Sequence, residues 1–79
     1  MITPAPTVLS VLTMCRRRHM RLTPMMLADK LHVPVQDIRA VESGKLPSCS
    51  KHLFTILDFN EIREHPVSLE LMDMMREAA

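Results

Sequence analysis

The sequence has few of the residues that β-sheets and aromatic cores use. It contains one glycine, two phenylalanines and no tryptophan or tyrosine among its 79 residues. Since alternating β-branched stretches are also few, the sequence predicts a helical protein. Its core has to be built from leucine, isoleucine, valine and methionine. A chain of this length forms one small domain with little stability in reserve, so we expect an oligomer.

The two cysteines, Cys15 and Cys49, are too few for a disulfide framework. We expect Cys15 in the core and Cys49 near the start of a helix. No zinc-site spacing combines them with the four histidines, and no cleavable signal or membrane-length apolar run is present. Neither a glycine-rich phosphate loop nor a nucleophile with a spaced histidine occurs. These absences predict a cytoplasmic protein that is not an enzyme, has no metal or other cofactor and does not bind membranes.

The charge is unevenly distributed, although the formal net charge is only +1. Residues 16–51 contain eight basic and three acidic side chains, a net charge of +5, whereas residues 52–79 contain two basic and six acidic ones, a net charge of −4. A basic half is suited to a polyanionic partner, and an acidic half would be kept away from it.

The first six residues, with Pro4 and Pro6, predict a flexible N-terminal arm. A helix is expected to follow, from about Thr7 to about His19. Its basic last turn complements the helix dipole. Its apolar residues recur at helical spacing and are expected to face the core: Val8, Leu9, Val11, Leu12 and Cys15.

Two short helices joined by a tight turn are predicted next. Thr23 can cap a helix that begins with Pro24 and runs to about Leu31. His32 then takes the turn position, where a left-handed backbone is often needed, and histidine adopts that conformation more readily than most residues. A third helix is expected at 35–42, with Ile38 and Val41 facing inward and Val35, Gln36, Arg39 and Ala40 facing outward.

The rest of the chain predicts further helices. Pro47 and Ser48 are expected to begin a fourth helix, and residues 59–65 are compatible with a short fifth one. Ser68 can cap a last helix that ends near Glu77. Because that helix is apolar on more than one side, residues 66–79 are expected to form a dimerisation element beside a domain at 7–65. The interface residues are expected to be Leu69, Leu71, Met72 and Met75.

The segment 22–45 resembles the helix-turn-helix motif of the Cro/CI, or XRE, family of transcriptional regulators. The matching positions are Leu22, Thr23, Leu27, Ala28, Leu31, Val33, Ile38, Val41, Glu42, Gly44 and Lys45, followed by Pro47 and Ser48. The resemblance covers about residues 8–60. It implies an all-α, lambda-repressor-like bundle of about five short helices. The function it implies is sequence-specific binding to a two-fold DNA operator as a homodimer.

The family pattern also implies roles for individual residues. Arg17 and Glu42 are expected to pair and to hold the first helix against the third. Base edges are expected to be read by Val35, Gln36, Arg39 and Ala40. DNA phosphates are expected at Arg16, Arg18, Arg21, Thr23, Ser43, Lys45 and Lys51.

Three positions depart from the family pattern. Pro24 replaces a phosphate-binding glutamine, His32 replaces the turn glycine, and Pro34 replaces a capping serine or threonine. The surface expected to face DNA is therefore less polar than usual. These departures leave a second hypothesis open: a protein-binding module with a helix-turn-helix fold that binds another regulator and not DNA.

Overall fold

The computed structural model describes residues 4–78. This range contains five helices, joined by turns and loops, and no strands. The all-α prediction is therefore confirmed. No helix within this range has the length and apolar character needed to cross a membrane. The helices are α1 (Ala5–His19), α2 (Pro24–Leu31), α3 (Val35–Glu42), α4 (Ser50–Phe59) and α5 (Pro66–Ala78).

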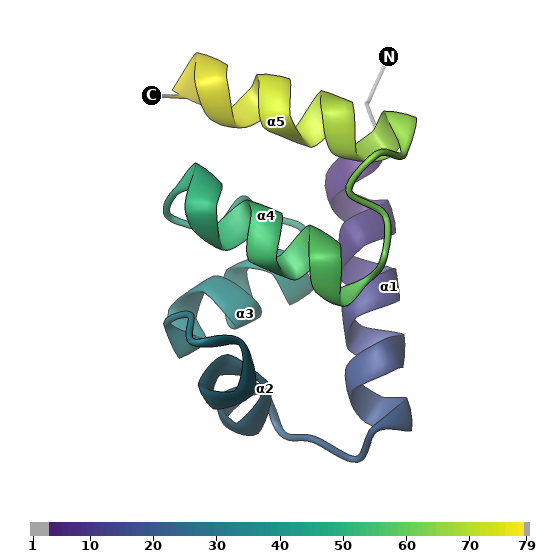
Figure 1. Cartoon of the computed structure of the whole chain (residues 1–79), viewed down its shortest axis with the longest axis vertical. Helices are drawn as coiled ribbons and strands as arrows, with labels where there is room; N and C mark the ends of the chain where they lie inside the picture. Colours follow the sequence, from purple (N-terminus) through teal and green to yellow (C-terminus); the bar gives the residue numbers. More distant parts are fainter. Residues whose placement is uncertain (1–3, 79) are drawn as a thin grey trace.

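The helices are stacked along a molecule that measures 33 × 21 × 21 Å (Figure 1). α1 runs along one side, α5 lies across one end, and α2 and α3 occupy the other end with α4 between. α1 packs against α3, α4 and α5, and α2 packs closely against α3. α1 is thus the element that joins the two ends of the molecule.

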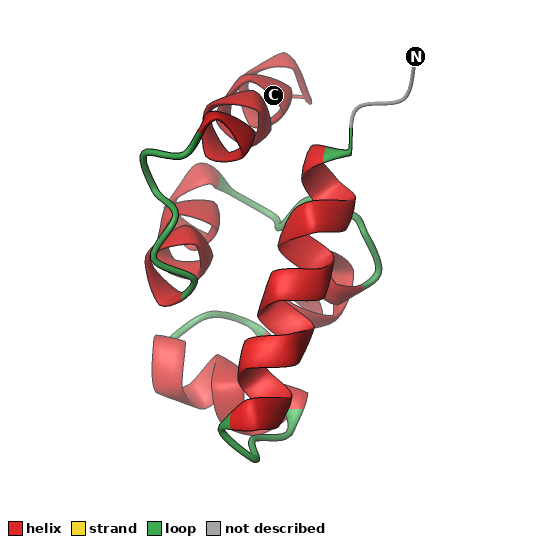
Figure 2. Ribbon diagram, turned by 90° about the vertical axis from the view of Figure 1, so that its right-hand side faces the viewer, coloured by secondary structure: helices red, strands yellow, loops and turns green. Residues whose placement is uncertain are grey.

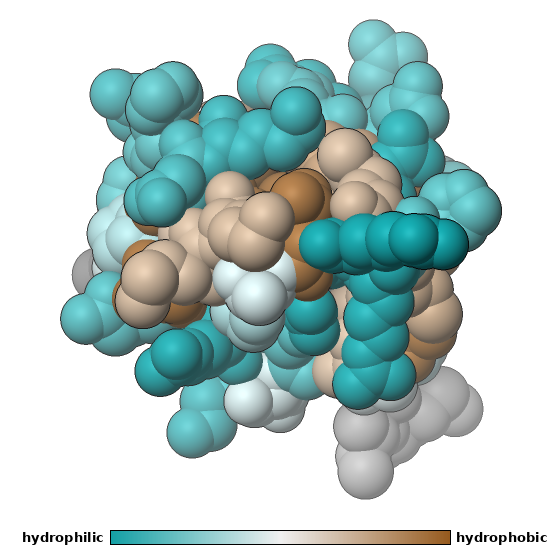
Figure 3. All heavy atoms as spheres, turned by 90° about the horizontal axis from the view of Figure 1, so that it is seen from below, coloured by the Kyte–Doolittle hydropathy of each residue, from teal (hydrophilic) through white to brown (hydrophobic). Residues whose placement is uncertain are grey.

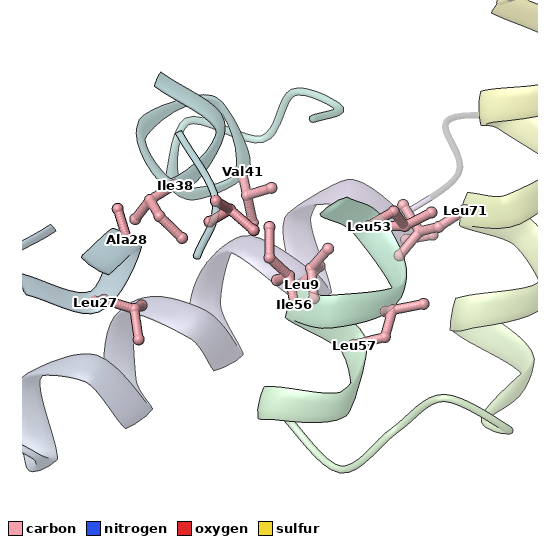
Figure 4. Packing of buried hydrophobic residues seen from close by; sticks show 11 residues of the cluster. Leu9, Leu27, Ala28, Ile38, Val41, Leu53, Ile56, Leu57 and Leu71 are labelled. Carbon is pink, nitrogen blue, oxygen red and sulfur yellow. The ribbon is translucent and has the colours of Figure 1, made fainter. Parts of the chain in front are cut away.

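The core is aliphatic and runs continuously through the molecule (Figure 4). Each completely buried leucine or isoleucine contributes about 1.5–3 kcal/mol to folding. The buried hydrophobic residues come from all five helices and the α2–α3 turn: Ala5, Leu9, Leu27, Ala28, Val33, Ile38, Val41, Leu53, Ile56, Leu57 and Leu71. The inward positions predicted for α3, Ile38 and Val41, are among them.

Three predicted helix boundaries are wrong. α1 begins at Ala5, inside the expected N-terminal arm, because a proline in the first turn lacks only an amide that has no partner within the helix. The other residues of that arm, 1–3, lie outside the described residues. α4 begins at Ser50 and not at 47–48, and residues 60–65 form turns in place of a fifth helix. Pro66 lies within the last helix, which therefore begins ahead of Ser68.

The orientation expected for α1 is only partly right. Leu9 faces the core, but Val11, Leu12 and Cys15 are exposed. The buried face of α1 instead carries Ala5, Leu9, Ser10 and Thr13. Ser10 and Thr13 are accommodated because both hydroxyls form hydrogen bonds, so their burial leaves no polar group unpaired.

The last helix belongs to the core of its own chain. Leu71 is completely buried, so its predicted place in a dimer interface is wrong. Met72 and Met75 are partly buried and pack against the same core. Among the four expected interface residues, Leu69 alone is exposed. The two apolar sides of α5 are explained by its contacts with α1 and α4.

Candidate nucleic-acid interface

Arg17 fixes the orientation of α3 relative to α1. Its Nε and Nη2 atoms donate to the two carboxylate oxygens of Glu42 at 2.7 and 2.9 Å. Its Nη1 donates to the backbone carbonyl of Leu22 at 2.8 Å, and the Ser10 hydroxyl donates to the carbonyl of Glu42. The side chains of Arg17 and Glu42 are only 11% and 10% exposed. The expected ion pair is therefore present and joins α1, the α1–α2 turn and the end of α3.

The charge of Arg17 is secured by the same contacts. The hydrogen bonds that Arg17 donates to Glu42, together with the negative charge of Glu42, raise the pKa of Arg17 above its ordinary value, against the opposing effect of burial. The guanidinium consequently stays ionised throughout the pH range in which proteins fold. A bidentate arginine–carboxylate pair of this kind fixes direction as well as distance.

A second polar cluster holds the other end of α3. Asp37 is buried and accepts hydrogen bonds from the backbone amide and hydroxyl of Ser48, at 3.0 and 2.8 Å. Its Oδ2 also lies 2.6 Å from Nδ1 of His52 on α4. Asp37 thus ties α3 to the loop before α4 and to the first turns of α4.

Ser48, His52 and Asp37 do not form a catalytic relay. Nδ1 of His52 contacts both the Ser48 hydroxyl and the Asp37 carboxylate. A relay needs one ring nitrogen at the carboxylate and the other at the nucleophile. The sequence interpretation missed this cluster. The signal in the sequence is only that Ser48, just before α4, and His52, in its first turn, are close along the chain.

The outer edge of α3 carries the polar side chains expected there. Gln36 and Arg39 are exposed, and Val35 and Ala40 are partly exposed. No ion pair within residues 4–78 involves Arg39. The structure therefore brings the four expected base-reading residues to one short helical surface, with Arg39 available for an external ligand.

The turns on either side of α3 have the backbone geometry that their sequences predict. His32 adopts a left-handed conformation, with φ 57° and ψ 44°, and ends α2. Gly44 has a φ of 82°. Lys45 then donates its amide to the carbonyl of Ala40 at 2.8 Å, which closes the end of α3. Ser43 and Lys45 are both exposed beside this turn.

The residues expected at phosphates are divided between two parts of the surface. The Thr23 hydroxyl caps α2 by accepting a hydrogen bond from the backbone amide of Met26 at 3.1 Å. Arg18 and Arg21 are exposed near the same turn. Arg16 points elsewhere: it pairs with Glu61 at 2.9 Å and lies 5.6 Å from the ring centre of Phe59. Lys51 is exposed on α4. The structure thus directs Arg16 to the turn after α4 and not toward α3.

The end of the molecule formed by α2 and the last turn of α1 combines apolar and hydrophilic surface. In Figure 3, apolar side chains occupy the middle of this end and hydrophilic ones surround them. The large exposed hydrophobic residues of these elements are Met20, Met25 and Met26. No physical role for the two methionines on α2 follows from the sequence, and both are solvent-exposed.

No group of three or more potential metal ligands gathers within residues 4–78. Comparison with known proteins found no matching family model, no similar curated protein and no similar solved structure.

Proposed function

We propose that this protein is a sequence-specific DNA-binding transcriptional regulator that acts as a homodimer on a two-fold operator. In this proposal, α2 and α3 form a helix-turn-helix of the lambda-repressor type, and α3 enters the major groove. Two copies are required because a single short helix makes too few base contacts, whereas two related by symmetry reach half-sites about one helical turn apart.

The observation that carries the proposal is the exposed edge of α3 on a rigidly held helix. Gln36 and Arg39 project from α3 while Arg17 and Asp37 fix its two ends. The two side chains have the chemistry of base readers, since glutamine can pair with adenine N6 and N7 and arginine with guanine O6 and N7. Fixing the helix before binding lowers the cost of placing those side chains.

Exposed cations near α3 support the same proposal. Lys45 follows α3 directly, and Arg18 and Arg21 precede α2. Cations in these positions would contact phosphates on either side of the groove and orient α3 without reading sequence. Pro24 and Pro34 offer no side-chain donor there, so we expect the affinity for DNA to depend strongly on these cations.

The test is selection of DNA fragments from a random pool, followed by fluorescence titration of the selected and a scrambled sequence at two salt concentrations. Preference for the selected sequence, with affinity falling as salt rises, would support the proposal. Absence of binding to any duplex at low salt would contradict it.

The exposed methionines favour one alternative, a module that binds another regulatory protein. Met20, Met25 and Met26 are exposed, and flexible methionine side chains adapt to protein partners. Substituting Met25 and Met26 with glutamine separates the two functions. If the protein binds DNA as proposed, the double variant still prefers the selected DNA sequence. If it is a protein-binding module, the double variant no longer binds its partner protein.

A further inference from the structure

The outer face of α1 is apolar and uncovered. Val11 is 53% exposed and Leu12 38%, Cys15 is also exposed, and Val8 is partly exposed. Spacings of three and four residues place these side chains on one side of the helix. In Figure 2, α1 runs down the front of the molecule, and α4 and α5 lie to its left. The apolar stripe of α1, residues 8, 11, 12 and 15, therefore has no partner within residues 4–78.

This stripe cannot be turned into the core by rotating α1. The opposite face is fixed by the hydrogen bond from Ser10 to Glu42, by the ion pair of Arg17 and by the bond from Asn60 to Thr13 at 2.9 Å. Rotation would break all three and leave buried polar groups unpaired, which costs more than the stripe would gain. The stripe is a stable feature of the surface.

The spacing of the stripe is symmetric about its own midpoint. A point between Val11 and Leu12 relates those two residues to each other and relates Val8 to Cys15. A two-fold axis through this point would place each residue of the stripe against another apolar residue of the partner's stripe, and the contacts would be mutual. We propose that a second copy of this chain covers the stripe, with the two α1 helices packed antiparallel and Val8 facing the partner's Cys15.

The charges on α1 favour the antiparallel direction. Besides Arg17, which is paired with Glu42, its last turn carries Arg16, Arg18 and His19, and its first turn carries no charged residue. Parallel helices would bring two basic turns together, whereas antiparallel helices place each basic turn beside the partner's uncharged first turn. The helix dipoles also favour this direction, since each positive end then lies beside a negative one.

A hollow beside the stripe provides room for the second copy. It has a volume of about 410 Å³ and is lined by Leu12, Cys15, Arg16, His19 and Asn60. In the proposed pairing, the residues opposite this hollow belong to the first two turns of the partner's α1. The partner's Val8 and Val11 would fill it, and the symmetric hollow would receive the equivalent residues of this chain.

The proposed register is tested by disulfide trapping. The Val8→Cys substitution in a Cys49→Ser background should give a covalent dimer on mild oxidation, because residues 8 and 15 of the two copies face each other. Without Val8→Cys, oxidation of the same background should give none. In antiparallel helices the two copies of Cys15 are offset by about 10 Å along the axis, at 1.5 Å per residue, which is beyond disulfide reach.

Two controls accompany the trapping experiment. Adding Cys15→Ser to the Val8→Cys chain should abolish the covalent dimer, since residue 8 then has no thiol opposite. A dimer joined through Cys15 alone would show parallel helices or an antiparallel register centred on Cys15, and either would overturn the proposal. Far-UV circular dichroism shows whether each variant retains its helices.

Sedimentation equilibrium of the unmodified chain and two variants tests the location of the interface without DNA. Leu12→Glu should raise the dimer dissociation constant roughly 30-fold or more, the size of effect found at the centre of interfaces. The matched control, Leu69→Glu on α5, should leave the constant unchanged. A monomer at all concentrations, or dissociation by Leu69→Glu alone, would overturn the proposal. Neither result depends on DNA binding, so a failure here is distinct from a failure of the proposed function.

Discussion

The Arg17 guanidinium meets the Glu42 carboxylate through two parallel hydrogen bonds, across 25 positions of sequence. The pair lies where α1, the turn before α2 and the last turn of α3 meet. Its side chains are largely withdrawn from water, so the contact depends on the fork geometry of arginine and not on charge alone.

Arg17→Lys is expected to destabilise the protein by about 2–3 kcal/mol, although the charge is kept, because lysine cannot form two parallel bonds to Glu42 while also donating to the carbonyl of Leu22. Urea denaturation followed by circular dichroism measures the change. The matched control is Arg16→Lys, whose ion pair with Glu61 is largely exposed and should contribute no more than ~1 kcal/mol. Equal losses in the two variants would contradict the role given to the fork.

The contribution of the Arg17 ionisation to stability is expected to be independent of pH from neutral to moderately alkaline conditions. Its pKa is raised in the folded protein, so the stabilisation is complete below the unfolded pKa and is lost only as the pH rises through the higher folded pKa. Urea titrations at pH 7 and 9 should therefore give the same difference between the natural chain and Arg17→Lys. A difference that shrinks by half over this interval would contradict the assignment.

Asp37→Ala is expected to destabilise the protein by about 2–4 kcal/mol, since it leaves the amide and hydroxyl of Ser48 and the ring of His52 without their acceptor. Amide hydrogen exchange should show faster exchange at Ser48 than in the natural chain. Asp29→Ala, at an exposed position on α2, is the control and should change stability by less than about 0.5 kcal/mol.

His32→Gly is expected to stabilise the protein by up to about 1 kcal/mol, because glycine adopts the left-handed backbone of this turn without steric cost. The opposite effect is expected at Gly44, where φ is also positive: Gly44→Ala should cost about 1 kcal/mol although no neighbouring atom obstructs a Cβ. Thermal unfolding of both variants shows whether each substitution raises or lowers the stability. A loss of stability in His32→Gly would show that the imidazole has a role beyond the turn.

Arg39→Ala should cost about 1–3 kcal/mol in binding to the selected DNA and relax the preference at one base position. Lys45→Ala should weaken binding to all sequences similarly and reduce the salt dependence. Arg76→Ala removes an exposed cation from α5 and is the matched control, with no change in preference expected. An unchanged preferred sequence in Arg39→Ala would mean that α3 does not read bases.

Signals confined to a few neighbouring residues predicted α2 and α3 well. The start of α2 was predicted from Thr23 and Pro24, and its end from His32. The inward face of α3 was predicted from the spacing of Ile38 and Val41. These features are local, so the sequence contains them directly. The ion pair of Arg17 came from the resemblance, because nothing in spacing alone links two residues so far apart.

Long-range packing was not predictable in the same way. Apolar periodicity assigns one face of a helix to the interior, but it does not distinguish the core of one chain from the interface with another. For α1 the inner face was taken instead by Ser10 and Thr13, whose hydrogen-bond partners lie more than 30 residues away. For α5 the reverse error occurred, since Leu71 fills the chain's own core.

The contact between α1 and α5 has a consequence for synthesis of the protein. α1 leaves the ribosome before α5, the helix against which it packs. The part of α1 that packs on α5 therefore stays uncovered until α5 emerges, and we expect it to be accessible to chaperones during that interval. Messenger truncated before α5 would yield a chain that holds α2 and α3 yet exposes the apolar residues of both α1 and α4 to degradation.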